Sequence, residues 1–311
     1  MENQALGLAE AIGLPIVVKR VTARAPWKNL PAQIWPRALN VMTPRSDPLL
    51  PPWPRLLISC GRRSVPFNTA IRKASAGTCF TVHIQSPKIR LNHFDLVVPP
   101  RHDDLAGPNV MSSRGALNRV TPANLAEGAR RLRPNLEHLP RPLVAVLLGG
   151  TSNSYRLTTA RASQIADQLL HLARSTGVGL AITPSRRTGT ENVAELRRKL
   201  TKEGIFFWDG SGPNPYFGLL GLADAIVVTC ESASMVSEAA TTGKPVYVID
   251  LDGGSRRFQR FHEMLREDGI TRPFDGRLEQ WNYALLDDTE TVAAMVRQRL
   301  GLAPQEPIGC R

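Results

Sequence analysis

Apolar residues along this chain follow two alternating patterns, and the alternation predicts its fold class. Short, nearly continuous apolar runs predict buried strands, whereas apolar residues three and four positions apart predict helices. The predicted strands span 15–18, 56–59, 79–84, 95–98, 143–148, 179–183, 205–208, 225–229 and 245–250. The predicted helices span 2–12, 66–76, 158–175, 191–201, 232–242 and 256–267, with a shorter one near Tyr216. Apolar strands separated by helices are typical of parallel sheets covered on both faces.

A proline-rich stretch predicts where two domains meet. The chain of 311 residues is long enough for two domains of ordinary size. Residues 133–142 contain three prolines, which interrupt regular structure. We therefore expect a domain over 1–140 and another over 141–311, each a Rossmann-like, doubly wound α/β unit. Residues 25–54, with eight prolines and three tryptophans, predict a largely irregular insertion in the first domain.

Positive charge is concentrated in the first half of the chain. The formal net charge is +12, and residues 1–140 hold 19 Lys and Arg against 8 Asp and Glu, whereas 141–311 hold 20 against 19. A positive field on one half attracts anionic partners, such as a membrane surface or a phosphorylated acceptor. Scattered surface arginines are the alternative interpretation. Nucleic acid is not expected as a partner, because no nucleic-acid-binding motif accompanies the charge.

Several classes of protein do not fit the sequence. No apolar run is long enough to span a membrane and the N-terminus lacks a signal-peptide pattern, so we expect a cytoplasmic protein, peripheral to the inner face of the membrane at most. The four cysteines form no C-x-x-C pair, which predicts reduced thiols and no metal site. The motifs of serine hydrolases, zinc proteases and P-loop proteins are missing, and the double glycine at 149–150 does not continue as a dinucleotide-binding fingerprint.

Two loops in the second half follow predicted strands and have residues suited to phosphate binding. Ligands of open α/β sheets bind at the carboxyl ends of the strands. The residues are Gly149, Gly150, Thr151 and Ser152 after one strand, and Ser185, Arg186 and Arg187 after another. Small residues let backbone N–H groups approach a ligand, and adjacent guanidinium groups can clamp a diphosphate. An ordinary glycine turn and solvated arginines are the alternatives.

A third loop opens a predicted helix and is the strongest candidate. The predicted nucleotide-diphosphate contacts here are Ser232, Ser234, Met235 and Glu238. Free N–H groups and the positive end of the helix dipole favour an anion at a helix start. Ser232 could instead serve only as a helix cap. Glu238, six residues on, is predicted to accept the two hydroxyls of a ribose, with an exposed surface glutamate as the alternative.

Four residues in the first half are candidates for the acceptor side of a reaction. His102 and Asp103 follow a predicted strand, and a His beside an Asp can be oriented to remove a proton, so this pair is the predicted catalytic base. A loop His that only bonds backbone is the alternative. Arg62 and Arg63 also follow a strand and are predicted to bind an anionic acceptor group, or else are surface charge.

Several short motifs are distributed over nearly the whole chain: 2–10 (ENQALGLAE), 61–63 (GRR), 94–99 (FDLVVP), His102-Asp103, 107–110 (GPNV), 147–150 (LLGG), 183–189 and 223–245. Through these motifs the sequence resembles the "elongated mitochondria" (mitochondrial-fission ELM) family. This family in turn resembles GT-B glycosyltransferases. The resemblance implies two Rossmann-like domains facing a cleft, with the nucleotide sugar held by the second. No cofactor is implied beyond a nucleotide-diphosphate sugar as substrate.

The chain departs from the family pattern at two places. Family members begin with a strand and a glycine-containing loop before the Glu-Asn-Gln helix, whereas this sequence starts at the helix. We therefore expect an N-terminal sheet that lacks its first strand, or a start site that lies further upstream. Glu231 stands where the family pattern has Asp, which lengthens the carboxylate by one methylene.

Two functions are consistent with these observations. The first is transfer of a sugar from a nucleotide diphosphate to a membrane-associated or anionic acceptor. The second is a non-catalytic, membrane-associated scaffold that recruits other proteins, as the family's part in organelle division implies. Both interpretations require the turns at Gly149, Arg186 and Ser232 to converge, with Glu238 at the rim of the same site.

Overall fold

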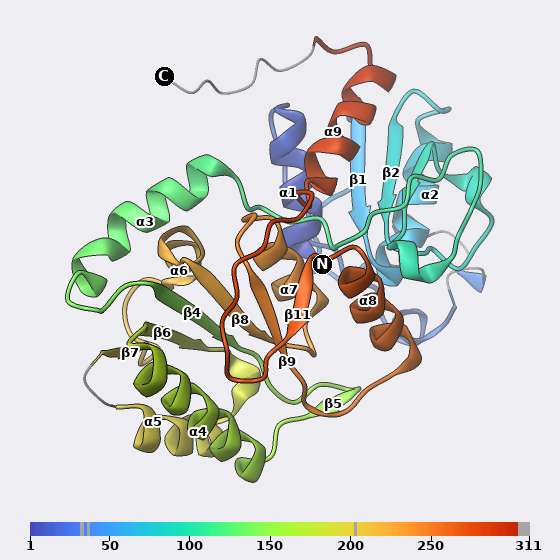
Figure 1. Cartoon of the computed structure of the whole chain (residues 1–311). Coiled ribbons are helices and arrows are strands. Elements are labelled where there is room, and N and C mark those ends of the chain that lie inside the picture. Colours follow the sequence, from blue (N-terminus) through green and yellow to red (C-terminus); the bar gives the residue numbers. More distant parts are fainter. Residues whose placement is uncertain (32–33, 36–37, 202–203, 304–311) are drawn as a thin grey trace. The chain divides into compact units, whose positions relative to one another are not determined.

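The computed structural model describes residues 1–31, 34–35, 38–201 and 204–303, and it divides into two compact units. The first unit contains Met1–Arg119 and Asp287–Arg311, and the second contains Val120–Leu286 (Figure 1). The predicted division at 140/141 therefore differs from the observed one, because the chain returns to the first unit at its end. The first unit has 19 Lys and Arg against 10 Asp and Glu, so the positive charge stays concentrated there. Cys310 lies outside the described residues.

The first unit is built on a small parallel sheet. Its strands, in spatial order, are β1 (Leu56–Cys60), β2 (Phe80–Ile84) and β3 (Leu96–Val98). The helices are α1 (Glu2–Ile12), α2 (Val65–Ala74) and α9 (Asp288–Arg299). Leu8 and Ile12 of α1 pack with Val292 and Val296 of α9 in one buried cluster. The final helix of the chain therefore completes the core of the first unit.

The predicted strand at 15–18 is wrong. These residues form no strand in the structure, and Val17 is 76% exposed. A strand requires a neighbouring strand for its backbone hydrogen bonds, and Pro15 has no N–H to offer. After Gly13 ends α1 with φ 82°, the segment continues as irregular backbone. The apolar run alone could not show that a neighbouring strand is missing.

The second unit has the strand order of a Rossmann fold. Its six-stranded sheet runs β11-β9-β8-β4-β6-β7, and every pairing is parallel. The strands are β4 (Leu143–Leu148), β6 (Gly179–Pro184), β7 (Ile205–Phe207), β8 (Ala225–Thr229), β9 (Val246–Ile249) and β11 (Thr271–Pro273). In chain order this is 3-2-1-4-5-6, which places the topological switch point between β4 and β8.

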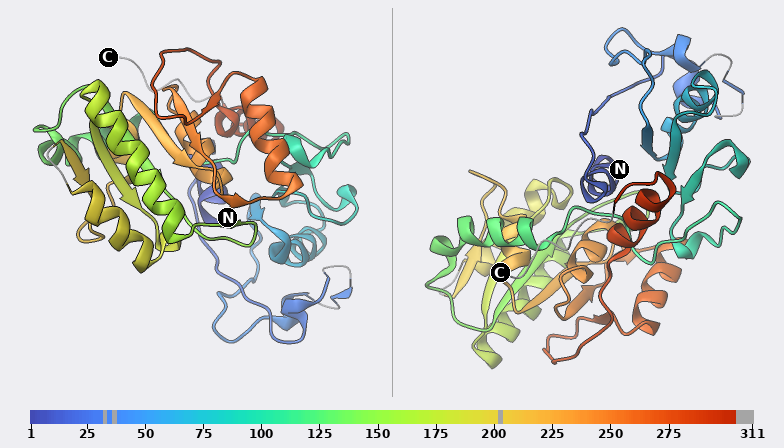
Figure 2. Two further views of the ribbon diagram at one scale, coloured as in Figure 1. Left: turned by 60° about the horizontal axis from the view of Figure 1, so that its bottom comes forward. Right: turned by 90° about the horizontal axis from the view of Figure 1, so that it is seen from above.

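Helices cover both faces of this sheet (Figure 2). They are α3 (Pro122–Leu136), α4 (Thr159–Thr176), α5 (Thr190–Leu200), α6 (Tyr216–Leu222), α7 (Ala233–Ala240) and α8 (Arg256–Glu267). The side chains of β4 and β8 are buried throughout, as their apolar sequences predict. The doubly wound α/β fold predicted for this half is confirmed. In the described part of the chain, no helix is long and apolar enough to cross a membrane.

The predicted linker at 133–142 is also wrong in part, because α3 runs through its first residues. Thr121 caps α3, and Leu132 and Leu136 are buried on it. The helix lies so close to α6 that a β-carbon on Gly128 would come within 2.6 Å of the Gly218 nitrogen. Pro134 is accommodated near the end of α3. The contact between α3 and α6 assigns this helix to the second unit.

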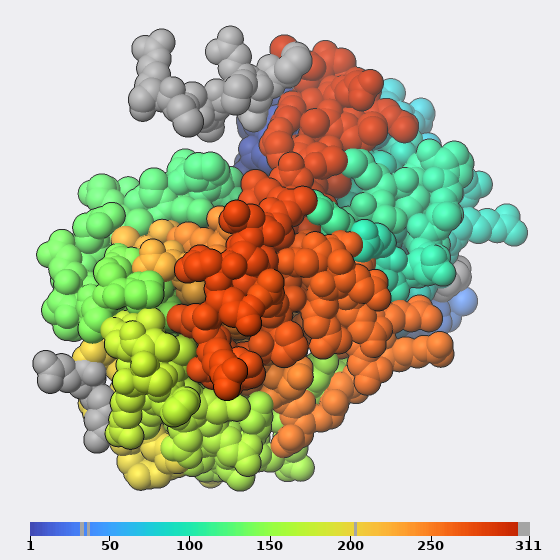
Figure 3. Space-filling model, in the orientation of Figure 1, coloured from blue at the N-terminus to red at the C-terminus, as the bar shows by residue number. Residues whose placement is uncertain are grey.

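Short elements and an irregular segment complete the second unit. β5 (Tyr155–Arg156) pairs antiparallel with β10 (Asp252–Gly253). The segment between β11 and α9, orange-red in Figure 3, lies on the surface of this unit. Within it, Trp281 packs edge-on against Tyr247, with ring centroids 5.1 Å apart. These aromatic contacts hold the segment against the outer part of the sheet.

Candidate functional site

The loops predicted to bind a ligand leave the sheet at its topological switch point. β4 and β8 are neighbours in the sheet, and β6 lies on the other side of β4. The loops after these three strands therefore start from adjacent positions at one edge. Hydrogen bonds from side chains and backbone groups join these loops to one another.

A single carboxylate, that of Glu231, links the three turns. Its Oε1 atom accepts the backbone N–H of Gly150 at 2.9 Å and lies 3.3 Å from Nη2 of Arg187. Thr188, in the same turn as Arg187, donates its hydroxyl to the carbonyl of Leu148 at 3.1 Å. The turns after β4, β6 and β8 thus converge, as both functional interpretations of the sequence require.

The backbone N–H groups of the four predicted residues after β4 are all used within the protein, contrary to the interpretation that they face a ligand. Gly149 donates to Oγ1 of Thr229 at 2.8 Å, and Gly150 donates to Glu231. Thr151 donates to the carbonyl of Arg187 at 3.1 Å, and Ser152 to that of Tyr155 at 2.9 Å. The glycines are needed instead for close packing. A β-carbon on Gly150 would lie 1.9 Å from the Arg187 carbonyl oxygen.

The β6 turn presents two exposed arginines. Ser185 caps the 3-10 turn Arg186–Thr188, accepting the N–H of Arg187 at 3.2 Å. The side chain of Arg187 is 45% exposed and pairs with Glu231. Arg186 is exposed, and among the described residues its side chain has no hydrogen-bond or ion-pair partner. Its guanidinium can therefore reach a ligand without breaking an internal contact.

Helix α7 begins directly after the β8 turn. Ser232 is its cap, with its hydroxyl 3.4 Å from the N–H of Met235, so the capping interpretation of this serine is confirmed. Ser234 and Met235 are half-buried in the first turn. The first N–H groups of any helix lack an intrahelical acceptor, and the dipole makes this end positive. This end of α7 therefore favours an anionic group.

Glu238 lies further along α7 and is not a freely solvated surface glutamate. It is half-buried, and the hydroxyl of Tyr216, on α6, donates to its Oε2 atom at 2.5 Å. Burial raises the pKa of Glu238, while the bond from Tyr216 works in the opposite direction. The contact fixes one carboxylate oxygen, and among the described residues the other has no hydrogen-bond partner and can accept from a ligand.

In the sequence, Glu231 differs from the family pattern only by replacing Asp, yet in the structure its carboxylate contacts the turns after β4 and β6 and so lies at the centre of the site. It is 2% exposed, and its Oε2 atom is buried without a hydrogen-bond partner among the described residues. Burial raises the pKa of this carboxyl, and the Gly150 N–H and Arg187 oppose the rise. Its position immediately after a buried strand and next to a capping serine was the signal available in the sequence.

The remaining predicted residues lie in the first unit. His102 and Asp103 occupy the 3-10 turn Arg101–Asp103 after β3, with both side chains largely sheltered and His102 Nε2 3.8 Å from Asp103 Oδ1. Arg62 and Arg63 begin the turn after β1 and are exposed. Since β1 and β3 belong to one parallel sheet, both turns follow its carboxyl edge.

Comparison with known proteins identifies relatives over most of the chain. The family model for mitochondrial fission ELM1 matches residues 1–300. The mitochondrial fission protein ELM1 of Arabidopsis thaliana is 34% identical over 278 residues, covering 79% of this chain and 64% of the plant protein. The uncharacterized protein RP120 of Rickettsia prowazekii (strain Madrid E) is 27% identical over 284 residues, covering 78% of this chain and 79% of that protein. The chain thus spans less than two thirds of the plant relative.

A solved structure extends the comparison to the fold. The UDP-GlcNAc 2-epimerase of Methanocaldococcus jannaschii superimposes with a TM-score of 0.52 at 12% identity, covering 79% of this chain and 77% of the epimerase. At this identity the similarity concerns the fold alone. It agrees with two α/β units built on parallel sheets, the GT-B type that the sequence predicts.

Proposed function

This chain belongs to the mitochondrial fission ELM1 family and has a GT-B-type fold, and from these premises we propose that its second unit binds a nucleoside-diphosphate sugar. The protein then transfers the sugar to a membrane-associated or anionic acceptor. The single observation that supports this proposal best is the convergence of the turns at Gly149, Arg186 and Ser232 at the switch point of the sheet.

The diphosphate is assigned to the start of α7 and to Arg186. The first turn of α7 offers N–H donors, and Arg186 has no competing partner among the residues described. Arg187 adds a second guanidinium, although part of its charge is balanced by Glu231. Gly149, Gly150, Thr151 and Ser152 donate no backbone N–H to the phosphates, because these groups are bonded within the protein.

The ribose is assigned to Glu238. Tyr216 fixes Oε2 of this half-buried carboxylate, so its orientation is already set before a ligand binds. The other oxygen, Oε1, is then available to accept hydrogen bonds from the ribose hydroxyls. Ala233 is the first residue of α7, and at a rise of about 1.5 Å per residue Glu238 lies roughly 8 Å further along the helix axis.

The reaction needs a base and a stabilised leaving group. The acceptor hydroxyl attacks the anomeric carbon, the bond from that carbon to the diphosphate oxygen breaks, and the hydroxyl proton passes to the base. Arg186 and the start of α7 would stabilise the departing diphosphate. His102, beside Asp103, is the candidate base, and Arg62 with Arg63 would bind the acceptor's anionic group.

Calorimetric titration tests the nucleotide site. Uridine, guanosine and adenosine diphosphates and their sugar derivatives are titrated into the wild type, Arg186→Ala and Glu238→Gln. Each variant should weaken binding by about 1–3 kcal/mol, the value of a charge-assisted hydrogen bond. Arg174→Ala is the matched control, because Arg174 is exposed at the end of α4, at the opposite edge of the sheet where β6 begins. Equal affinities in all four proteins would overturn the assignment.

Two observations favour a second candidate, a scaffold without catalysis. The N–H groups of Gly149, Gly150, Thr151 and Ser152 are bonded within the protein. The buried carboxyl of Glu231 also lies between the turns, which makes the site less favourable for an anion than the sequence indicates. Pelleting with anionic and neutral vesicles, run beside a sugar-nucleotide turnover assay, separates the two. Binding to anionic vesicles without nucleotide affinity or turnover would favour the scaffold.

A further inference from the structure

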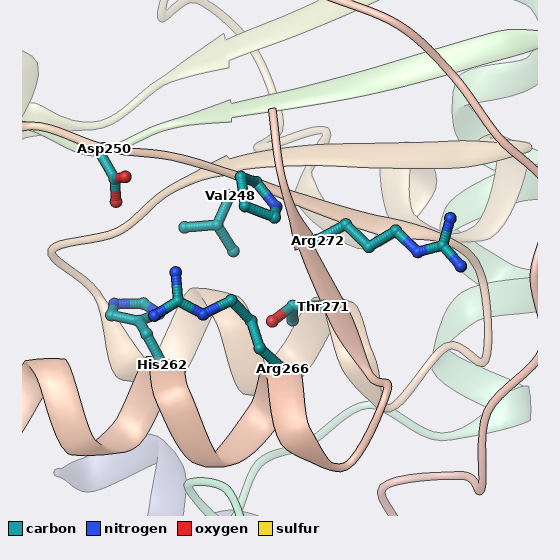
Figure 4. Close-up of a pocket in the computed structure, with 7 residues that line it drawn as sticks. Val248, Asp250, His262, Arg266, Thr271 and Arg272 are labelled. Carbon is teal, nitrogen blue, oxygen red and sulfur yellow. The ribbon is translucent and has the colours of Figure 1, made fainter. Parts of the chain in front are cut away.

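A small pocket lies between α8 and the strands β9 and β11, and the residues predicted for the nucleotide site are not among those that line it. It encloses about 240 Å³, including the part open to solvent, and is lined by residues of β9, α8 and β11 (Figure 4). The lining residues are Val248, Asp250, His262, Arg266, Thr271, Arg272 and Pro273. All of them belong to the second unit.

Two buried polar atoms line this pocket without a partner. His262 is 8% exposed and Thr271 is 3% exposed. Neither Nδ1 of His262 nor Oγ1 of Thr271 has a hydrogen-bond partner among the described residues. Buried polar groups in folded proteins are nearly always bonded, so a ligand or water in this pocket can bond both atoms.

The hydrogen bond on the other side of the ring determines what His262 can offer. Its Nε2 atom lies 2.8 Å from the carbonyl oxygen of Cys230. A carbonyl only accepts, so Nε2 must hold a proton. In the neutral ring Nδ1 is then an acceptor, and in the charged ring it becomes a donor directed at the pocket. The second proton therefore goes to Nδ1 and nowhere else.

Arg266 supplies the available positive charge. Its side chain runs along α8 toward His262 in Figure 4, and it has no hydrogen-bond or ion-pair partner among the described residues. Arg272 points away from the pocket, where it pairs with Glu279 and lies 4.4 Å from the centroid of the Trp281 ring. Asp250 is the acidic group that faces the same space.

We propose that this pocket binds a small oxyanion such as phosphate, held by the Arg266 guanidinium, the Thr271 hydroxyl and a doubly protonated His262. A single water molecule could satisfy His262 and Thr271, and solvent can hydrate the Arg266 guanidinium because Arg266 is exposed. A tetrahedral oxyanion differs from water in that one molecule accepts from all three groups and also neutralises the charge of the guanidinium. The inference stands independently of the nucleotide site, which uses other residues.

Binding is coupled to protonation of His262. Without the anion, burial lowers the pKa of His262; Arg266 adds to this effect, whereas the Cys230 carbonyl and Asp250 oppose it. The other charged group of the lining, Arg272, is paired elsewhere, and the Cys230 thiol accepts the N–H of Leu251 at 3.3 Å. An anion beside Nδ1 favours the imidazolium and so raises the pKa of His262. An oxyanion whose charge does not change with pH should therefore bind more tightly at about pH 6 than at about pH 8.

The test follows the imidazole signals of the protein by NMR. Sodium phosphate is titrated at about pH 6 and about pH 8, with sodium chloride at matched ionic strength. The chain has six histidines, and His262→Gln, which retains a donor for the Cys230 carbonyl, assigns the signal. Phosphate should raise the pKa of His262 by at least about one unit, and chloride should not. Calorimetry in two buffers of different ionisation enthalpy counts the proton taken up.

Variants locate the bound ion. Arg266→Ala should weaken phosphate binding, followed at the His262 signal, by about tenfold or more. Arg260→Ala is the matched control, because Arg260 is an exposed arginine of the same helix that does not line the pocket. Arg186→Ala should leave the His262 response unchanged, which separates this pocket from the nucleotide site. Thr271→Val, nearly the same shape without the hydroxyl, serves if His262→Gln fails to fold.

Two results would overturn the proposal. One is a His262 signal that does not respond to phosphate at either pH. The other is a response that chloride reproduces or that survives Arg266→Ala unchanged, which would mean an adventitious ion only. Either result would leave a water molecule as the occupant of the pocket.

Discussion

Gly149 and Glu231 fit together so closely that no side chain could be added between them. A β-carbon built on Gly149 would lie 1.5 Å from Oε1 of Glu231. The same oxygen accepts the N–H of Gly150, so Glu231 cannot move away without losing that bond. Gly150 and Glu231 are 81 residues apart in the chain. The double glycine and the glutamate therefore form one structural unit although they are distant in sequence.

Gly149→Ala should destabilise the second unit. The new methyl must displace Glu231 from its bond to Gly150, and overpacking of this kind costs about 1–3 kcal/mol. Chemical denaturation followed by circular dichroism measures the free energy of unfolding. The double variant Gly149→Ala, Glu231→Ala removes the clash and should be less destabilised than the sum of the two single variants. Additive effects would show that the two residues do not constrain each other.

Glu231→Gln should change how stability depends on pH. The unfolded carboxyl has a pKa near 4.5, and in the folded protein burial raises it. Between these two values the folded state keeps a proton that the unfolded state releases, so wild-type stability falls as the pH rises through that window. Glutamine does not titrate, so the wild-type stability relative to the variant should fall with a slope of at most about 1.4 kcal/mol per pH unit. A difference that is constant with pH, or rises with it, would contradict this.

Tyr216→Phe tests how Glu238 is held. Loss of the hydroxyl leaves Oε2 of a half-buried carboxylate without its donor, which should cost about 1–2 kcal/mol of stability. If Glu238 binds the ribose, nucleoside diphosphates should also bind several-fold more weakly, while inorganic diphosphate should not. Glu238→Gln combined with Tyr216→Phe completes a double-mutant cycle. A coupling energy near zero would show that the pair is incidental.

The order of strands and helices in the second unit could be predicted from the sequence because its strands are buried on both faces. Every residue of β4 and β8 is buried, so their apolar runs are unambiguous. The segment 15–18 has the same apolar pattern but no neighbouring strand to pair with, and the apolar pattern of a segment does not show whether such a neighbour exists. Helix α3 was missed because its contact with α6 depends on glycines that show no periodicity.

The convergence of the three turns could also be predicted, because it follows from strand order. The role of the β4 glycines could not, since their N–H groups are taken by partners from distant turns. Nor could the role of Glu231, whose position between the turns depends on three loops at once. Likewise, nothing local indicates that α9 returns to pack on α1.

His83 should make the stability of the protein fall in mild acid. It is fully buried on β2, where its Nδ1 atom lies 2.9 Å from Oγ of Ser59, and its Nε2 atom has no hydrogen-bond partner among the described residues. The charged ring would need acceptors for both N–H groups, so the buried site disfavours it. Burial lowers the pKa of His83 to about 4, against 6.5 in the unfolded chain.

The sign and size of the effect follow from these two values. Between about pH 6.5 and about pH 4 the unfolded state binds a proton that the folded state refuses, so stability is lost as the pH falls through this range. The loss from one such group is roughly 3 kcal/mol. His83→Asn, which keeps a polar atom near Ser59 but does not titrate, should lack this component. Denaturation of both proteins across this range measures the difference, and parallel pH profiles would show that His83 is protonated in the folded state.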